Sequence, residues 1–240
     1  MSGEIAILAI TSASIALFHT LLGPDHYIPF IVMAKARKWS LSYTSLITFL
    51  CGIGHVAGSI ILGMVGVALG VAVSKIQVIE SFRGDLAAWA FIAFGLIYFA
   101  WGMKRAYGKH PHTHSHSHID VHDHDHGHIH KSEHAHPHVS NHNVEKANIT
   151  PWVLFTIFVL GPCEPLIPIV MLPAARNSLT GYIASIGVFA LITIITMLSV
   201  VIVSYFGIKM VKLNWLERFS HAMAGAAICF SGLAIVFLGL

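Results

Sequence analysis

Two stretches of the chain decide the fold: LGPDHYIPFIVMAKARKWSL at residues 22–41 and LGPCEPLIPIVMLPAARNSL at residues 160–179. They lie 138 positions apart and share nine identical residues out of twenty without a gap. Each begins with a Gly-Pro pair inside an apolar segment, and proline removes a backbone hydrogen bond that a continuous helix needs. We therefore expect two related halves, each interrupted at the same place.

The rest of the sequence has the composition of a membrane protein. Its 240 residues are 55% hydrophobic and only 10% charged, with a mean hydropathy of +0.73, whereas a soluble domain carries about 25% charged residues. Since a bilayer core takes about 20 apolar residues per helix, the pattern predicts an all-α, polytopic membrane protein with about six transmembrane helices. The predicted spans are 5–22 (followed by a short apolar piece, 27–34), 43–73, 86–103, 152–172, 182–206 and 219–240.

The spans divide into two three-helix repeats, residues 1–104 and 150–240, separated by a polar segment at 105–149. An odd number of spans in each half requires that the halves insert in opposite orientations, so the repeat is expected to be inverted. Inverted repeats are typical of secondary transporters, in which the substrate binds where the halves meet.

Positive charges predict the orientation. Lysine and arginine gather after the first, third and fifth spans, so the positive-inside rule places the 105–149 loop in the cytoplasm and both termini outside a cytoplasmic (inner) membrane. On the opposite side, Glu80 and Asp85 are expected in a solvated loop between the second and third spans.

Ionisable residues directly follow both breaks: Asp25 and His26 in the first half, Cys163 and Glu164 in the second. Burying such groups in a membrane costs several kcal/mol each unless they are paired or bind an ion. Imidazole suits nickel, copper, iron and zinc, and a thiolate adds softness. Because inverted symmetry brings the two pairs towards each other, we expect these four residues to bind a transition-metal ion, with His55 of the second span as a further ligand.

A family resemblance supports the same chemistry. The segment from His19 to His26 resembles the His-x4-Asp-His signature of the nickel/cobalt permease and efflux (NicO-like) family, with one additional residue in the spacing. The Gly-Ile-Gly-His element ending at His55 is similar to the Gly-His element in the next helix of that family. The resemblance implies a six-helix metal transporter, a Ni or Co ion as transported substrate, His19 among the metal ligands, and export slightly favoured over import.

A second resemblance concerns the other break. The segment 161–165, Gly-Pro-Cys-Glu-Pro, resembles the Gly-Pro-Cys element of membrane thiol–disulfide electron carriers and implies a related fold. Those carriers need a second cysteine in the matching half, and the repeat places Asp25 opposite Cys163. This difference argues against a redox function.

The polar segment contains most of the histidine. Fourteen of the eighteen histidines fall between His110 and His142. The segment has too little apolar material to bury a core and is expected to be disordered, and its composition is typical of metal binding. We expect it to capture ions at the cytoplasmic face through its histidines: His110, His112, His114, His116, His118, His122, His124, His126, His128, His130, His134, His136, His138 and His142.

The sequence therefore predicts a transporter of divalent transition-metal ions, not an enzyme. We expect secondary transport by alternating access, driven by proton exchange because metal ligands must lose protons to bind. No permanently bound cofactor, nucleic-acid partner or ATPase subunit is expected, since no nucleotide-binding motif is present and the net charge is only +3. The expected partners are the metal ion and the lipid bilayer. Two alternatives stay open: a membrane metal-delivery or sensor protein for a nickel enzyme, and a thiol–disulfide electron carrier.

Overall fold

The computed structural model describes residues 2–108, 149–175, 179–210 and 214–238. All of its helices belong to one unit, formed by Met1–Tyr107 together with Ile149–Leu240. The predicted histidine-rich loop, with all fourteen of its candidate histidines, lies outside the described residues.

Every regular element in the described ranges is helical, which confirms the all-α class. The first half contains α1 (Ser2–Leu22), the 3-10 turn η1 (Pro24–His26), α2 (Ile28–Arg37), α3 (Leu41–Ala68) and α4 (Val73–Tyr107). The second half contains α5 (Thr150–Leu160), α6 (Leu166–Ala175), α7 (Leu179–Met210) and α8 (Asn214–Leu238).

Five helices, rather than the predicted six, are long and apolar enough to cross a membrane. They are Gly3–Leu22, Leu41–Ala68, Val73–Tyr107, Leu179–Ile208 and Glu217–Leu238. The difference arises at 152–172, where the segment 161–165 divides the predicted span into α5 and α6, each too short to cross alone. Five such helices are compatible with a multi-pass membrane protein.

The predicted loop around residues 74–85 is also helical, because α4 begins at Val73. Glu80 is completely buried in this helix, and its Oε2 accepts a hydrogen bond from Nη1 of Arg83 at 2.9 Å. Opposite charges three residues apart lie on one face of a helix and attract each other. Of the two residues expected in a solvated loop, Glu80 therefore forms an ion pair inside the protein, whereas Asp85 is exposed but lies in the helix.

The two halves have the same arrangement of helices along the sequence. α1 ends and α2 begins at positions that recur 138 residues later in α5 and α6; the pairs are Leu22 and Leu160, and Ile28 and Leu166. The Gly-Pro pairs at residues 23–24 and 161–162 terminate α1 and α5, because proline lacks the N–H that would continue each helix. The sequence repeat is thus also a repeat of helix boundaries.

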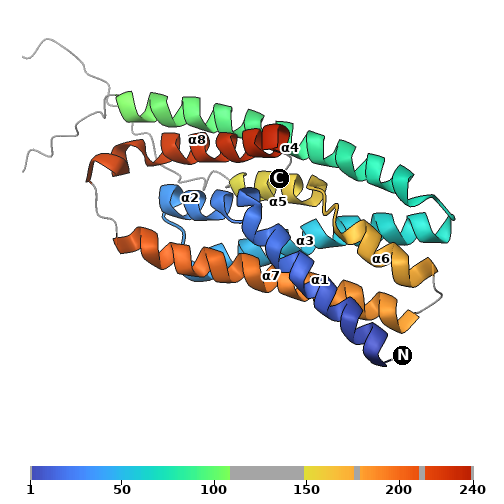
Figure 1. Cartoon of the computed structure of the whole chain (residues 1–240). Coiled ribbons are helices and arrows are strands. Elements are labelled where there is room, and N and C mark those ends of the chain that lie inside the picture. The colour runs from blue at the N-terminus through green and yellow to red at the C-terminus, as the bar shows by residue number, and fades with distance from the viewer. Residues whose placement is uncertain (1, 109–148, 176–178, 211–213, 239–240) are drawn as a thin grey trace, which may run out of the picture. The chain divides into compact units, whose positions relative to one another are not determined.

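The packing of the helices shows the same correspondence (Figure 1). α1 packs on α7 as α5 packs on α3, and α2 packs on α8 as α6 packs on α4. The contact of α2 with α7 likewise corresponds to that of α6 with α3. α3 and α7, which occupy equivalent positions in the two halves, also contact each other. The most extensive contact joins α4 to its counterpart α8, and the two helices run side by side in Figure 1. These contacts of one half therefore have counterparts in the other, whereas those of α4 with α5 and with α3 are not matched to the same extent by those of α8 with α1 and α7.

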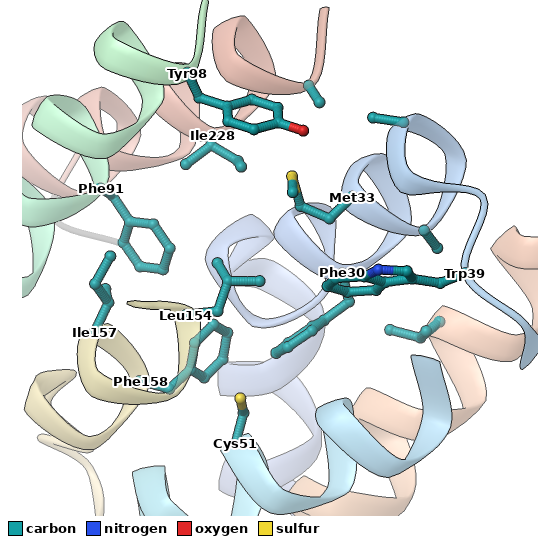
Figure 2. Packing of buried hydrophobic residues seen from close by; sticks show 14 of the residues in the cluster. Phe30, Met33, Trp39, Cys51, Phe91, Tyr98, Leu154, Ile157, Phe158 and Ile228 are labelled. Atoms are coloured by element: carbon teal, nitrogen blue, oxygen red, sulfur yellow. The ribbon is translucent and has the colours of Figure 1, made fainter. Parts of the chain in front are cut away.

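Buried apolar residues form two clusters. The first core joins α2, α3, α4, α5, α7 and α8, and Figure 2 shows Phe30, Met33, Cys51, Phe91 and Phe158 converging within it. The second core joins α1, α3, α6 and α7; it consists of Ala16, Val56, Cys163, Leu166, Ile169 and Phe189. α3 passes from the first core to the second between Cys51 and Val56, and His55 lies in this interval.

Candidate metal centre

Three imidazoles from separate elements meet at the first break. His19 lies in the last turn of α1, His26 ends η1, and His55 is at the middle of α3, about 20 Å from either end of that helix. The ring centroids are 4.8 Å apart for His19 and His26, 5.0 Å for His26 and His55, and 6.4 Å for His19 and His55. The break and α3 thus gather three potential metal ligands.

One ring nitrogen of each imidazole has no hydrogen-bond partner among the described residues. His26 and His55 are each only 2% exposed, and the Nε2 atoms of all three histidines are buried and unpaired. Buried polar atoms are nearly always hydrogen-bonded, so each exception needs an explanation. Unpaired ring nitrogens on three adjoining imidazoles indicate a site for a ligand that binds them.

The second break orients His55. Proline at position 162 has no N–H, so the carbonyl oxygen of Phe158 lacks the donor that a continuous helix would supply. His55 Nδ1 lies 3.4 Å from this oxygen. A carbonyl can only accept, so Nδ1 carries a proton, and in the neutral form of the ring Nε2 keeps its lone pair. Metal-binding histidines are oriented by this kind of outer hydrogen bond.

The first break orients His26 in a similar way. Its Nδ1 lies 3.1 Å from the carbonyl oxygen of Gly23 and 3.2 Å from Oδ1 of Asp25. The Asp25 side chain is 17% exposed, and it lies on the Nδ1 side of the ring, away from the unpaired Nε2. A carboxylate in this position fixes the orientation of the ring and raises the basicity of its other nitrogen, Nε2.

The second break contributes a thiol. Cys163 is completely buried, and its Sγ and one ring nitrogen each of His19 and His55 all lie within 4.8 Å of one another. A tetrahedral ion with metal–nitrogen bonds of about 2.0–2.1 Å and a metal–sulfur bond of about 2.3 Å holds its ligands about 3.3–3.6 Å apart. The side chains therefore need to approach one another by about 1 Å when an ion enters.

Five of the six predicted membrane-embedded site residues lie in this region. The close group of ligand atoms contains His19, His55 and Cys163, whereas His26, with Asp25 against its ring, lies beside this group but outside it. The sixth, Glu164, follows Cys163 but is exposed, and the close group of ligand atoms does not include it. Asp25 contacts the ring of His26, whereas His19 stands beside the thiol. Metal coordination by these residues stays a prediction.

Glu80 and Arg83 were missed as parts of this region. Arg83 Nη2 donates to the carbonyl oxygen of Val159 at 2.8 Å, immediately before the second break. The sequence signal was an acidic and a basic residue three apart beside apolar segments, which in a membrane protein favours a buried pair over a loop.

The donor atoms indicate the class of ion. Neutral imidazole nitrogen and cysteine sulfur suit transition metals, whereas magnesium and calcium prefer oxygen ligands. Comparison with known protein families, with curated proteins and with solved structures finds no match for this chain. The function must therefore be inferred from the residues and the geometry of this centre.

Gly23 keeps space for the His26 ring, which gives a testable prediction. A Cβ atom at residue 23 would lie 2.5 Å from His26 Nδ1 and 2.8 Å from Asp25 Oδ1. Gly23→Ala should displace the oriented imidazole and weaken Co²⁺ binding about 10–100-fold, as other outer-shell changes at metal sites do. Titration of the purified protein with Co²⁺ measures the affinity.

Gly3→Ala is the matched control for this change. Residue 3 lies near the other end of α1, the helix that Gly23 follows, and a Cβ there would meet nothing within 4 Å. Its affinity should equal that of the wild type. Unchanged binding by Gly23→Ala would show that His26 orientation does not matter for the ion.

Proposed function

We propose that this protein moves a divalent transition-metal ion across a cytoplasmic membrane, with nickel or cobalt favoured. The observation that carries the proposal is the group formed by one ring nitrogen each of His19 and His55 and the buried thiol of Cys163, with the ring of His26 beside it. A binding site alone fits a delivery or sensor protein equally well. Transport is favoured because the centre lies where two matching helix breaks meet, the position at which secondary transporters bind their ions.

The proposed architecture is a pair of inverted repeats with six crossings. α5 and α6 together form the sixth crossing, interrupted at residues 161–165, so each half crosses the membrane three times. Irregular backbone at membrane depth is tolerated where protein buries it, and here first-half residues satisfy the backbone groups at the break. The recurrence of the helix ends at the two breaks and the corresponding helix contacts of the two halves support this arrangement. The loop at 105–149 is proposed to be cytoplasmic, with both termini outside.

The two apolar cores supply the barriers that alternating access requires. The first core contacts the centre through Phe158, whose ring lies 6.3 Å from that of His55, and the second core includes Cys163 itself. A groove of about 380 Å³ lined by Ser14, Phe18, His19 and Pro165 reaches the centre from one side. Opening one core while the other stays closed would expose the ion to one side at a time.

Protons are the proposed driving ions, because imidazole and thiol ligands bind metal only after losing their protons. The histidine-rich loop is proposed to capture ions on the cytoplasmic face, with export slightly favoured as the direction. A thiol–disulfide carrier is disfavoured because Asp25 occupies the position that matches Cys163. Loss of metal dependence combined with sensitivity to alkylation of Cys163 would revive that alternative.

The test is ion flux into proteoliposomes that contain the purified protein, with Ni²⁺, Co²⁺, Zn²⁺ and Mn²⁺ supplied in parallel under an imposed pH gradient. The wild type should move Ni²⁺ or Co²⁺ selectively. Asp25→Asn keeps the size of the side chain but removes its charge beside His26, so flux should fall about 10–100-fold. If no ion moves in either direction of the gradient, transport is wrong and a delivery or sensor role takes its place.

A further inference from the structure

Two backbone groups left unpaired by the second break are both satisfied by residues of the first half. In a continuous helix the N–H of Cys163 would donate to the carbonyl oxygen of Val159. Instead Cys163 N donates to Oγ of Ser59 at 3.1 Å, and Arg83 Nη2 donates to Val159 O at 2.8 Å. α3 and α4 therefore hold open the turn that carries the thiol.

A buried carboxylate fixes the arginine in place. Glu80 is completely buried, and its Oε2 lies 2.9 Å from Nη1 of Arg83. Because an unpaired charge in a membrane is costly, each partner keeps the other in this position. Charge-assisted hydrogen bonds of a planar guanidinium also have a defined direction, so the second nitrogen of Arg83 is aimed at the break.

The surrounding backbone leaves room for this contact. A Cβ at Gly58 would lie 2.5 Å from Arg83 Nη2 and 3.0 Å from Val159 O. A Cβ at Gly84 would lie 2.8 Å from Cγ of Pro162. Glycines at these two positions allow the guanidinium to reach α5 and allow α4 to pack against the proline of the break.

We propose that Arg83, fixed by Glu80, is a positioning residue that holds the second break open and presents the thiol of Cys163 to the imidazoles. The inference rests on the proposed function, because it assigns the origin of the soft ligand in the proposed metal centre. Gly161 has an extended conformation, with φ −58° and ψ 136°, and a closed helical turn there would carry the thiol away from His19 and His55. Arg83 thereby sets the preference for ions that bind thiolate, such as Co²⁺ and Zn²⁺, over ions such as Mn²⁺ that prefer oxygen.

The experiment uses Co²⁺ as a spectroscopic probe of the full-length protein in detergent. In the wild type a near-ultraviolet thiolate-to-Co²⁺ charge-transfer band should accompany the visible d–d bands, and Cys163→Ser should lose the charge-transfer band alone. Arg83→Met should lose that band and weaken Co²⁺ binding about 10–100-fold, while the d–d bands from imidazole ligation remain. Arg83→Lys, which restores one donor, should recover part of the band.

Two further variants separate positioning from folding. Because Arg83→Met leaves Glu80 buried without its partner, the double variant E80Q/R83M, which removes both charges, is measured beside it. Arg105→Met is the matched control, since Arg105 is exposed on the same helix and contacts the ring of Trp101; its spectrum should equal the wild type's.

Retention of the charge-transfer band at wild-type affinity in E80Q/R83M would overturn the inference. Absence of the band in the wild type would also overturn it, by removing Cys163 from the ligand set. Neither result decides transport, which the flux assay tests independently.

Discussion

Replacing His55 by alanine should abolish metal binding and ion flux while the protein remains folded in the membrane. The loss should exceed about 100-fold, because a direct ligand contributes more than the about 10–100-fold attributed to outer-shell groups. His55 is 2% exposed, and its Nδ1 faces the carbonyl oxygen of Phe158, so its unpaired Nε2 is left to face the centre. Isothermal titration with Ni²⁺ and Co²⁺ and flux in proteoliposomes measure the two effects.

His221→Ala is the matched control for this prediction. His221 also belongs to a membrane helix, but its Nδ1 is hydrogen-bonded to the hydroxyl of Tyr98 at 2.8 Å and its ring packs on Trp101. Its removal should leave affinity and flux close to those of the wild type. Equal losses in the two variants would mean that any membrane histidine is needed, and the proposed centre would be wrong.

The helix breaks could be predicted from the sequence because they depend on a local property. Proline at residues 24 and 162 lacks an N–H wherever the chain folds, so α1 and α5 end at the expected positions. That Asp25, His26 and Cys163 lie in one region could also be predicted, since matching breaks in two related halves are expected to face each other. Both predictions used only local chemistry and the repeat.

The position of His19 needed the three-dimensional path of the break. In a continuous helix, residues 19 and 26 would share a face but lie about 10 Å apart along the axis. The turn at η1 instead brings the two rings to 4.8 Å. The extra residue in the spacing between His19 and Asp25 is thus compatible with a close approach, which spacing alone could not show.

The spacing of Glu80 and Arg83 in the sequence is compatible with a buried pair, but the contact of that pair with α5 could not be predicted, because it depends on tertiary structure. The positive-inside rule counts charges as solvated, and only tertiary structure shows Arg83 bridging Glu80 to α5. The two halves also differ at equivalent positions: the residue that matches His55 is Thr193, whose buried Oγ1 has no hydrogen-bond partner in the described chain. The first half therefore contributes the imidazoles and the second half the thiol, although their helices correspond.

The contact between α4 and α8 should be the least tolerant of added volume, and Gly225→Leu tests it. A Cβ at Gly225 would fall well inside van der Waals contact with the backbone N of Phe99, and one at Gly95 would do the same with Cys229. Small residues let membrane helices approach this closely, and a backbone cannot move aside as a flexible side chain can. Overpacking costs about 1–3 kcal/mol where side chains adjust, so the loss here should exceed that range and prevent folding.

Fluorescence-detected size-exclusion chromatography over a temperature ramp measures the remaining folded protein. Gly187→Leu, in α7, is the control: a Cβ at residue 187 meets nothing within 4 Å, and the glycine is exposed, so its melting temperature should match the wild type's. Normal folding of Gly225→Leu would show that α4 and α8 do not meet as described. Because α4 and α8 are equivalent helices of the two halves, that result would also weaken the proposal that the halves are related by symmetry. If Gly225→Leu does not fold and Gly187→Leu does, the contact between α4 and α8 is required to hold the two halves together. The same contact then keeps the two helix breaks, and with them the proposed metal ligands, in place.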